Sequence, residues 1–346
     1  MQMHRFEWIS AGSPAEAGAA APITVADAML ATAGSAAAAE AVVLKAGGID
    51  LLDLMKEGLL APRRIVNLRA IAGMDAIVAE KDGGVRIGAL ATLDQIGTHG
   101  LIAGRYTALA DAVGTSASPQ IRHVATLGGN IVQRPRCWYF RSLAHRCLRK
   151  GGGRCFAMHG ENQYHAIFAN EVCAVVHPST AATALLALDA RVEIVNAQGE
   201  ARTPLLDEFF VAPETDVQRE NDLKPGEVVT AVLLPPRATG ATSVHLRESD
   251  RQAFDWPIAD VAVALERDAN GLCRRAVIVL GAAAPMPYRA RSAEDLLAGK
   301  AIDAAAARAA GQAALEGATP LAKNRYKLAI FATLVRRTVL RAAGQE

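Results

Sequence analysis

The spacing of apolar residues along the first half of the chain predicts short helices that alternate with short strands. Residues 23–33 carry apolar side chains at helical spacing, with Thr24 in the N-cap position and Gly34 as a stop. Thr92 is placed to cap a second short helix. The other elements predicted here are strands at 41–44, 64–70 and 85–89, and helices at 51–57, 92–98 and 104–113.

In the second half of the chain, a helix at 180–188 is followed mainly by β patterns. Pro235 and Pro236 end the strand at 228–234, and residues 237–240 are typical of a linker, so we place a domain boundary there. The other elements predicted in this half are strands at 190–195, 204–210, 243–248, 258–266 and 274–280, and helices at 301–315 and 324–342. The last helix has an apolar stripe that we expect to face a core, formed by Leu328, Phe331, Leu334 and Val335.

The composition indicates a soluble globular protein with a full core. The chain has 346 residues, of which 51% are hydrophobic and 21% are charged, and its net charge is +2. With charges this close to balance, the chain has no overall electrostatic attraction to nucleic acid or a membrane surface. No apolar run is long enough to predict a membrane span. Glu7, Pro14 and Glu16 stand where a secretory signal needs apolar residues, so the sequence predicts a cytoplasmic protein, in which disulfides are disfavoured.

Two paired-glycine turns are candidates for phosphate binding. The first, Lys45-Ala46-Gly47-Gly48-Ile49-Asp50-Leu51, lies between a predicted strand and a predicted helix, where backbone N–H groups can approach a phosphate. The second, Thr126-Leu127-Gly128-Gly129-Asn130, lies beyond a predicted loop at 114–119. Two such turns suit a diphosphate held from two sides, although each could also be a plain tight turn. The chain has no G-x-G-x-x-G or Walker pattern, so an ordinary Rossmann site is not expected.

Four of the five cysteines lie in a segment with almost no regular periodicity, between Asn130 and the helix predicted at 180–188. They are Cys137, Cys147, Cys155 and Cys173. Buried free thiols and a zinc site are both open alternatives, but the paired short spacings of zinc knuckles are missing. An iron–sulfur cluster tolerates irregular spacing and is the preferred interpretation. Cys273 stands alone on a predicted strand and is expected to be structural.

The cysteine segment is also strongly basic. Seven basic residues and no acidic residue occur between positions 134 and 154: Arg134, Arg136, Arg141, Arg146, Arg149, Lys150 and Arg154. Such residues could stabilise an anionic cluster, or they could form a solvated loop that docks on an acidic partner subunit. His145 and His159 lie among the cysteines but are not assigned as ligands. No Ser-His-Asp or paired-carboxylate constellation is evident, so we assign no catalytic residue.

The glycine turns, the His177-Pro178-Ser179 segment and the strand that ends before Pro235 together resemble the FAD-binding subunits of the molybdenum hydroxylases, a family that includes xanthine dehydrogenase and carbon monoxide dehydrogenase. The cysteine insert, about residues 131–176, resembles that of bacterial periplasmic-type aldehyde oxidoreductases and of 4-hydroxybenzoyl-CoA reductase. The segment from Arg134 to Arg141 is closer to the aldehyde enzymes. The resemblance implies an α+β fold: a two-part FAD-binding domain of the PCMH (vanillyl-alcohol-oxidase-like) type over residues 1–238, then a three-strand, three-helix domain over 241–346.

The resemblance also implies cofactors and partners. The chain would bind FAD and one [4Fe-4S] cluster held by the four cysteines at positions 137, 147, 155 and 173. Its partners would be a large subunit with molybdopterin cytosine dinucleotide, where substrate is oxidised, and a small subunit with two [2Fe-2S] clusters. Electrons would pass from the small subunit to the FAD and on to an external acceptor. A signal on a partner could carry the folded complex to the periplasm.

Carried over to this sequence, the resemblance assigns thirteen residues to FAD. They are Lys45, Ala46, Gly47, Gly48, Ile49, Asp50, Leu51, Thr126, Gly128, Gly129, Asn130, Thr180 and Arg247. Ile49 and Thr180 depart from the family, which usually has Thr and Asp at those positions. The function predicted is an electron-transfer flavoprotein subunit of a molybdenum aldehyde oxidoreductase. Two alternatives remain, the medium subunit of an aryl-CoA reductase and a zinc-stabilised docking subunit without redox function.

Overall fold

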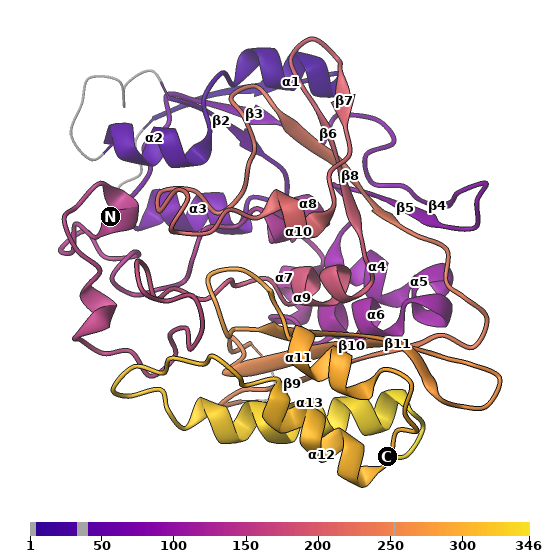
Figure 1. The fold of residues 1–346 in the computed structure, drawn as a ribbon. Coiled ribbons are helices and arrows are strands. Elements are labelled where there is room, and N and C mark those ends of the chain that lie inside the picture. The colour runs from indigo at the N-terminus through magenta and orange to yellow at the C-terminus, as the bar shows by residue number, and fades with distance from the viewer. Residues whose placement is uncertain (1–4, 33–40, 252–253) are drawn as a thin grey trace.

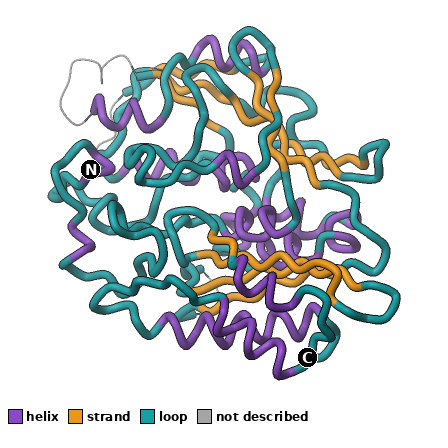
Figure 2. Tube along the Cα trace, in the orientation of Figure 1, coloured by secondary structure: helices purple, strands orange, loops and turns teal. Residues whose placement is uncertain are grey.

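The computed structural model describes residues 5–32, 41–251 and 254–346. Figure 1 shows a small N-terminal unit, a central five-stranded sheet with helices, and a C-terminal sheet covered by helices. Residues 131–176, magenta at the left of Figure 1, lie beside all three, and Figure 2 shows that this segment is mostly loop. Its only regular elements are two short 3₁₀ helices, η2 (Leu148–Lys150) and η3 (Phe156–Met158). The near absence of periodicity there is confirmed.

The N-terminal unit is a three-stranded parallel sheet with helices α2 and α3 on one face and α1 on the other. The strand order is β1-β3-β2, and the connection from β2 to β3 passes through helix α3. Buried side chains such as Met29 on α2, Val43 on β2, Leu54 on α3 and Ile65 on β3 form its core. The elements are β1 (Glu7–Ser10), α1 (Pro14–Ala20), α2 (Val25–Thr32), β2 (Val42–Lys45), α3 (Ile49–Lys56) and β3 (Arg64–Asn67).

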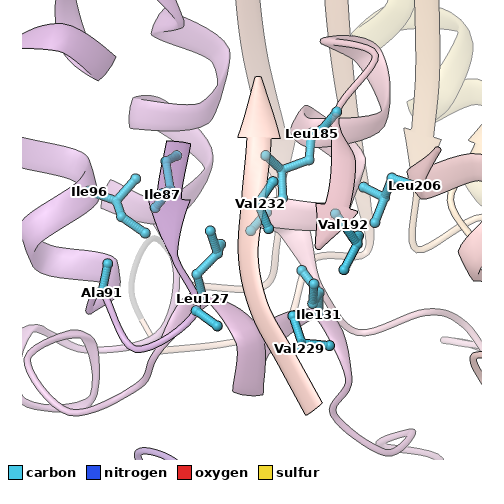
Figure 3. Close-up of a cluster of buried hydrophobic side chains, with 14 of the residues drawn as sticks. Ile87, Ala91, Ile96, Leu127, Ile131, Leu185, Val192, Leu206, Val229 and Val232 are labelled. Atoms are coloured by element: carbon cyan, nitrogen blue, oxygen red, sulfur yellow. The ribbon is translucent and has the colours of Figure 1, made fainter. Parts of the chain in front are cut away.

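The central unit is an antiparallel sheet of order β4-β5-β8-β6-β7. Figure 3 shows its core, in which Ile87 on β5 and Val232 on β8 meet Leu127 and Ile131 on helix α8. The strands are β4 (Ile77–Ala79), β5 (Val85–Gly88), β6 (Arg191–Val195), β7 (Ala201–Arg202) and β8 (Val228–Leu234). The helices are α4 (Leu93–Thr98), α5 (Gly100–Arg105), α6 (Thr107–Gly114), α7 (Pro119–Arg122), α8 (Leu127–Ile131), α9 (Thr180–Ala187) and α10 (Leu206–Phe209).

The C-terminal unit is a four-stranded antiparallel sheet, β12-β11-β10-β9, with three helices on one face. The predicted three strands are present, and a two-residue strand, β12, adds a fourth. Phe331, Leu334 and Val335 of the last helix are buried, so its apolar stripe faces the core as predicted. The elements are β9 (Thr242–Glu248), β10 (Ala259–Arg267), β11 (Cys273–Gly281), β12 (Tyr288–Arg289), α11 (Arg291–Leu297), α12 (Ala304–Ala313) and α13 (Lys327–Ala342).

Helix α9 joins the central and C-terminal units. Every one of its residues is buried, because it contacts α6 and α8 on one side and β10 and β11 on the other. A helix that is apolar all round is expected in such a position. It begins at Thr180, directly after the His-Pro-Ser segment, so that segment is held between two cores.

Several predicted elements need correction. The single helix predicted at 104–113 is two helices, α5 and α6, separated at Tyr106, whose hydroxyl donates to the carbonyl of Pro235 at 2.8 Å. The strand predicted at 204–210 is the short helix α10, whose buried Leu206 and Phe209 are three positions apart and so share a face. Ala33 and the predicted stop at Gly34 lie outside the described residues. Helix α2 begins as predicted, because the N–H of Asp27 donates to the Thr24 hydroxyl at 3.2 Å.

Among residues 5–32, 41–251 and 254–346, no helix is long and apolar enough to cross a membrane.

Candidate functional site

The first glycine turn packs directly against the segment that precedes the second. Gly48 begins helix α3 with a positive φ of 89°, a conformation that glycine adopts without strain. A Cβ atom on Gly47 would lie 2.2 Å from the carbonyl oxygen of Val124, so only glycine fits this position. The two turns are therefore neighbours in the fold, although they are distant in sequence.

The second glycine turn is the start of the short helix α8. Thr126 caps α8, and its hydroxyl accepts a hydrogen bond from the N–H of Gly129 at 3.3 Å. A Cβ atom on Gly128 would lie 2.9 Å from the Cβ of Ala89, just beyond strand β5. Since Leu127 and Ile131 point into the central core in Figure 3, the turn has a rigid support.

Both glycine turns open into one large cleft. Its volume is about 370 Å³, and it is open to solvent. Ligand pockets commonly measure about 300–1,000 Å³, so the cleft falls within the range of ligand sites. All thirteen residues predicted to contact the cofactor line this cleft: Lys45, Ala46, Gly47, Gly48, Ile49, Asp50, Leu51, Thr126, Gly128, Gly129, Asn130, Thr180 and Arg247. The structure brings the whole set together, while its role in binding stays a prediction.

Lys45 gives the cleft a cation beside the first turn. Its Nζ donates to the carbonyl of Ala46 at 3.2 Å and lies 5.4 Å from the centre of the Trp8 ring. Burial, together with the charge of Arg69, lowers the pKa of Lys45. No carboxylate of the described chain forms an ion pair with it, so an anionic ligand would be its natural partner.

The polar groups around Thr180 form a small buried network. The hydroxyl of Thr180 lies 2.6 Å from that of Ser116 and 3.3 Å from the carbonyl oxygen of Ala112. The Ser116 hydroxyl donates to the same carbonyl at 2.7 Å. With Ser116 donating there, Thr180 can donate to Ser116 and still accept a hydrogen bond from the cleft.

Arg247 lines the cleft, but its guanidinium is largely committed to the protein. It donates to the carbonyl of Thr115 at 2.7 Å, the hydroxyl of Ser249 at 3.0 Å and the carbonyl of Asp255 at 2.9 Å. Burial lowers the pKa of Arg247. The residue therefore fixes the loop after β9 against the cleft wall.

Two aromatic residues of this loop stand at the mouth of the cleft. Phe254 and Trp256 line it, yet they are 61% and 49% exposed. Phe254 has a positive φ of 75°, and its N–H donates to the carbonyl of Ala117 at 3.2 Å. The Trp256 ring lies 4.9 Å from the guanidinium carbon of Arg136, so it bridges the loop and the cysteine segment. Sequence reasoning missed both residues, because a single aromatic residue in a loop has no periodic signal.

The four cysteines of the insert line one small cavity. Cys137, Cys147, Cys155 and Cys173 all line it, its volume is about 10 Å³, and all four are free thiols. The side chains of Phe140 and Phe168 from the same insert are buried in the N-terminal and C-terminal cores, respectively. The insert is therefore fixed to both units. Cys273 is buried on β11, away from this cavity, as predicted for a structural residue.

The thiols differ in their electrostatic environment. Burial raises the pKa of the Cys137 thiol to about 11. A hydrogen bond from the Cys155 thiol and the nearby charge of Arg149 lower the pKa of Cys173, against the opposing effect of burial. A cationic group and hydrogen-bond donors beside Cys173 favour its thiolate, the form that binds metals.

The cavity differs from a site for a single metal ion. In the part of the chain that the structure describes, no three His, Cys, Asp or Glu side chains form a group that could hold one metal ion. A zinc ion requires its thiolates at about 2.3 Å from one centre. In a cluster, each thiolate binds a different iron, so the thiolates lie farther apart. All four thiols line one space, and those of Cys155 and Cys173 are close enough to share a hydrogen bond.

Most of the basic residues of the insert are paired with acids of this chain. Arg134 and Arg149 both contact Glu220, at 3.0 and 2.5 Å, in a buried site. Arg136 and Arg141 both contact Asp50, at 2.9 and 2.6 Å. These four guanidinium groups are therefore not free to dock on an acidic partner. Because Asp50 lies in the first turn of α3, the side chains of Arg136 and Arg141 also tie the insert to the first glycine turn.

Family models match almost the whole chain. Residues 15–237 match the FAD binding domain in molybdopterin dehydrogenase, and residues 244–342 match the CO dehydrogenase flavoprotein C-terminal domain.

Individual relatives are similar over most of their length. The aldehyde oxidoreductase FAD-binding subunit PaoB of Escherichia coli (strain K12) is 32% identical over 302 residues, covering 87% of this chain and 91% of PaoB. The carbon monoxide dehydrogenase medium chain of Hydrogenophaga pseudoflava is 26% identical over 301 residues, covering 86% of this chain and 87% of that one. A solved carbon monoxide dehydrogenase from H. pseudoflava, which lacks the Mo-pyranopterin moiety, matches with a TM-score of 0.72 and 25% identity over 99% of both chains.

Proposed function

Because this chain belongs to the FAD-binding, or medium, subunits of the molybdenum hydroxylase and xanthine dehydrogenase family, we propose that it is the electron-transfer subunit of an aldehyde oxidoreductase and carries both FAD and a [4Fe-4S] cluster. It is an oxidoreductase subunit, as its relatives are. The observation that supports the proposal best is the convergence of thirteen expected FAD contacts on one cleft, with four thiols around a separate cavity.

The residues of the cleft fit a dinucleotide. The backbone N–H groups of the two glycine turns, with Lys45, would bind the diphosphate, because glycine allows close approach and Lys45 has no acidic partner among the described residues. Thr180 would accept from a hydroxyl of the ribityl chain. FAD, when bound, takes up electrons and passes them on singly or in pairs. Phe254 and Trp256 at the mouth would limit access of water to the cleft.

The second cavity supports the cluster. Its four thiols come from widely spaced positions in an irregular segment and line one cavity, where each thiolate would bind one iron. Arg149, which contacts both Glu220 and Cys173, would offset the negative charge of the bound group. The likeness to an aldehyde oxidoreductase subunit favours this function over that of an aryl-CoA reductase subunit, whose insert would hold a similar cluster.

We propose the same partners as the family resemblance implies. A large subunit with molybdopterin cytosine dinucleotide would oxidise the aldehyde, and a small subunit with two [2Fe-2S] clusters would deliver electrons to this chain. An external acceptor would receive them. The proposed compartment is the cytoplasm, or the periplasm if a partner carries the export signal.

The test is an absorbance spectrum of this chain, purified alone and in its complex, with metals and acid-labile sulfide counted per chain. We expect flavin bands, a broad band from thiolate-bound iron, and four irons with four sulfides on the chain alone. A colourless protein with one zinc per chain would replace this proposal with the non-redox docking subunit. Activity of the complex on an aryl-CoA, but not on aldehydes, would replace it with the reductase.

A further inference from the structure

One histidine of the insert contacts a predicted cluster ligand. The Nε2 atom of His165 lies 3.2 Å from the Sγ of Cys137, within the range of a hydrogen bond to sulfur. His165 is only 4% exposed and lines the same cavity as the four cysteines. Its ring centre lies 5.7 Å from that of Trp138 and 6.2 Å from that of Tyr139, so aromatic neighbours restrict its movement.

The surroundings of the ring decide which nitrogen bears the proton. The Nδ1 atom of His165 is buried and has no partner within the described chain, whereas Nε2 faces the Cys137 sulfur. A neutral imidazole has one N–H group and one bare nitrogen. The tautomer with its proton on Nε2 is the one that gives this N–H group a partner.

The backbone of His165 is held by the C-terminal unit. Its carbonyl oxygen accepts a hydrogen bond from Nζ of Lys327 at 3.1 Å and from the side-chain amide of Asn324 at 3.0 Å. Both donors are completely buried. Lys327 also donates to the carbonyl of Ala282 at 2.5 Å, next to strand β11. Two hydrogen bonds therefore fix the backbone from which the imidazole extends, and the third fixes Lys327.

Lys327 is an unusual residue for a purely structural role. Its ammonium group is fully buried, and none of the ion pairs within the described ranges includes it, while Asp260 acts on it only at a distance. Burying an ammonium group is costly without a carboxylate in contact. An apolar side chain would fill the same space at lower cost, but it would leave the His165 carbonyl with one donor fewer.

We propose that His165 donates its Nε2 proton to the Cys137 sulfur and thereby raises the reduction potential of the cluster, with Lys327 and Asn324 as positioning residues. The inference rests on the cluster proposed above. Hydrogen bonds to cluster sulfurs stabilise the more negative, reduced state, so they shift the potential upward. A potential set in this way fixes how readily the cluster takes electrons from its neighbours.

The test compares His165→Phe with His165→Gln and with His145→Phe as a matched control. His145 lies in the same insert, 5.1 Å from Tyr139 between ring centres, and its Nδ1 is 3.1 Å from the Ser142 hydroxyl rather than near a thiol. Each variant is purified in the whole complex. Iron, sulfide and flavin are counted, and the cluster potential is measured by titration followed by electron paramagnetic resonance.

We expect His165→Phe to keep four irons and to show a more negative potential. His165→Gln, which retains an N–H donor, should recover part of the shift, and His145→Phe should show none. Lys327→Met should shift the potential in the same direction by a smaller amount, which provides a second test if His165→Phe does not fold. An unchanged potential in His165→Phe would overturn the inference, and so would loss of iron, because that would make His165 a ligand. Absence of iron from the unmodified chain would instead overturn the proposed function.

Discussion

The hydroxyl of Ser179 donates a hydrogen bond of 2.5 Å to the side-chain amide oxygen of Asn130. The same hydroxyl accepts the N–H of Ala182 at 2.9 Å and so caps helix α9. One hydrogen bond therefore joins the second glycine turn to the His-Pro-Ser segment. This hydrogen bond holds together two segments that line the cleft.

Replacing Asn130 or Ser179 by alanine should weaken flavin retention. The loss of one hydrogen bond corresponds to about 1 kcal/mol, or about a fivefold weaker affinity. Because the two residues act as a pair, the double variant should be little worse than either single variant. Fluorescence of released flavin measures the affinity, with Asn196→Ala, which does not line the cleft, as the control. Fully additive losses would show that the two residues act separately.

Gly47→Ala tests the close approach of the two turns. The new Cβ would lie 2.2 Å from the backbone oxygen of Val124, which cannot move without shifting the second turn. We expect a stability loss of about 1–3 kcal/mol and loss of bound flavin. Gly104→Ala is the control, because a Cβ atom there meets nothing within 4 Å. Denaturant unfolding and flavin content of both variants provide the comparison, and equal behaviour would contradict the close packing.

Cys155→Ser should lower iron content while flavin stays largely bound. Cys155 lines the small cavity and not the large cleft, so its loss affects the cluster ligands and spares the nucleotide contacts. Iron, sulfide and flavin assays measure the effect. Cys273→Ala, which alters a buried thiol outside the cavity, should leave all three unchanged. Full iron retention in Cys155→Ser would remove this residue from the ligand set.

Asp50→Asn should loosen the insert. Asp50 accepts hydrogen bonds from the Arg134 N–H at 2.8 Å and from Arg136 and Arg141, and its side chain is only 17% exposed. Removing its charge leaves these partly buried partners unsatisfied, at a cost of about 1–3 kcal/mol. Asp53→Asn is the matched control, because Asp53 is 48% exposed and such ion pairs contribute about 0–1 kcal/mol.

Limited proteolysis and chemical unfolding would compare these two variants. Faster cleavage within 131–176 in Asp50→Asn alone is the expected result. Equal cleavage in both variants would show that the network around Asp50 does not hold the insert.

His177 should make the protein less stable in acid. Burial, with the charge of Arg149, lowers the pKa of His177 to about 3 from its ordinary 6.5, so between these values the unfolded chain binds a proton that the folded chain does not. Stability therefore falls as pH drops from about 6.5 to about 3, with a slope of up to about 1.4 kcal/mol per pH unit. Urea unfolding across this range should give a shallower decline for His177→Gln and not for the exposed His123→Gln. Parallel declines would exclude His177 as the cause.

The sequence predicted most regular elements because their signals are local. Thr24 and Thr92 cap their helices as predicted, and Gly48 begins α3 in the backbone conformation that the double glycine permits. The errors arose where tertiary contacts decide the outcome. Tyr106 divides two helices because its hydroxyl reaches Pro235, more than a hundred positions away, and no local pattern reveals that contact. The short strand β1 obtains its stability from pairing with the distant strand β3.

The candidate site was predictable in its backbone and less so in its side chains. The glycine turns and the four cysteines were identified because their residue types carry a specific chemistry. Ser116, Phe254 and Trp256 were missed, because their place in the cleft depends on the fold alone. The partners of the basic insert could not be read from the sequence either. Asp50 and Glu220 lie far from the insert along the chain and meet its arginines only after folding.

The backbone of His165 depends on hydrogen bonds from Asn324 and Lys327, which can form only after these two residues have been synthesised. The carbonyl oxygen of His165 accepts a hydrogen bond from Lys327, which lies 162 positions later in the chain. Until residues 324–327 have been synthesised and packed on the C-terminal unit, the backbone of His165 lacks both of these donors. Loss of this segment would therefore leave one wall of the cysteine cavity unsupported.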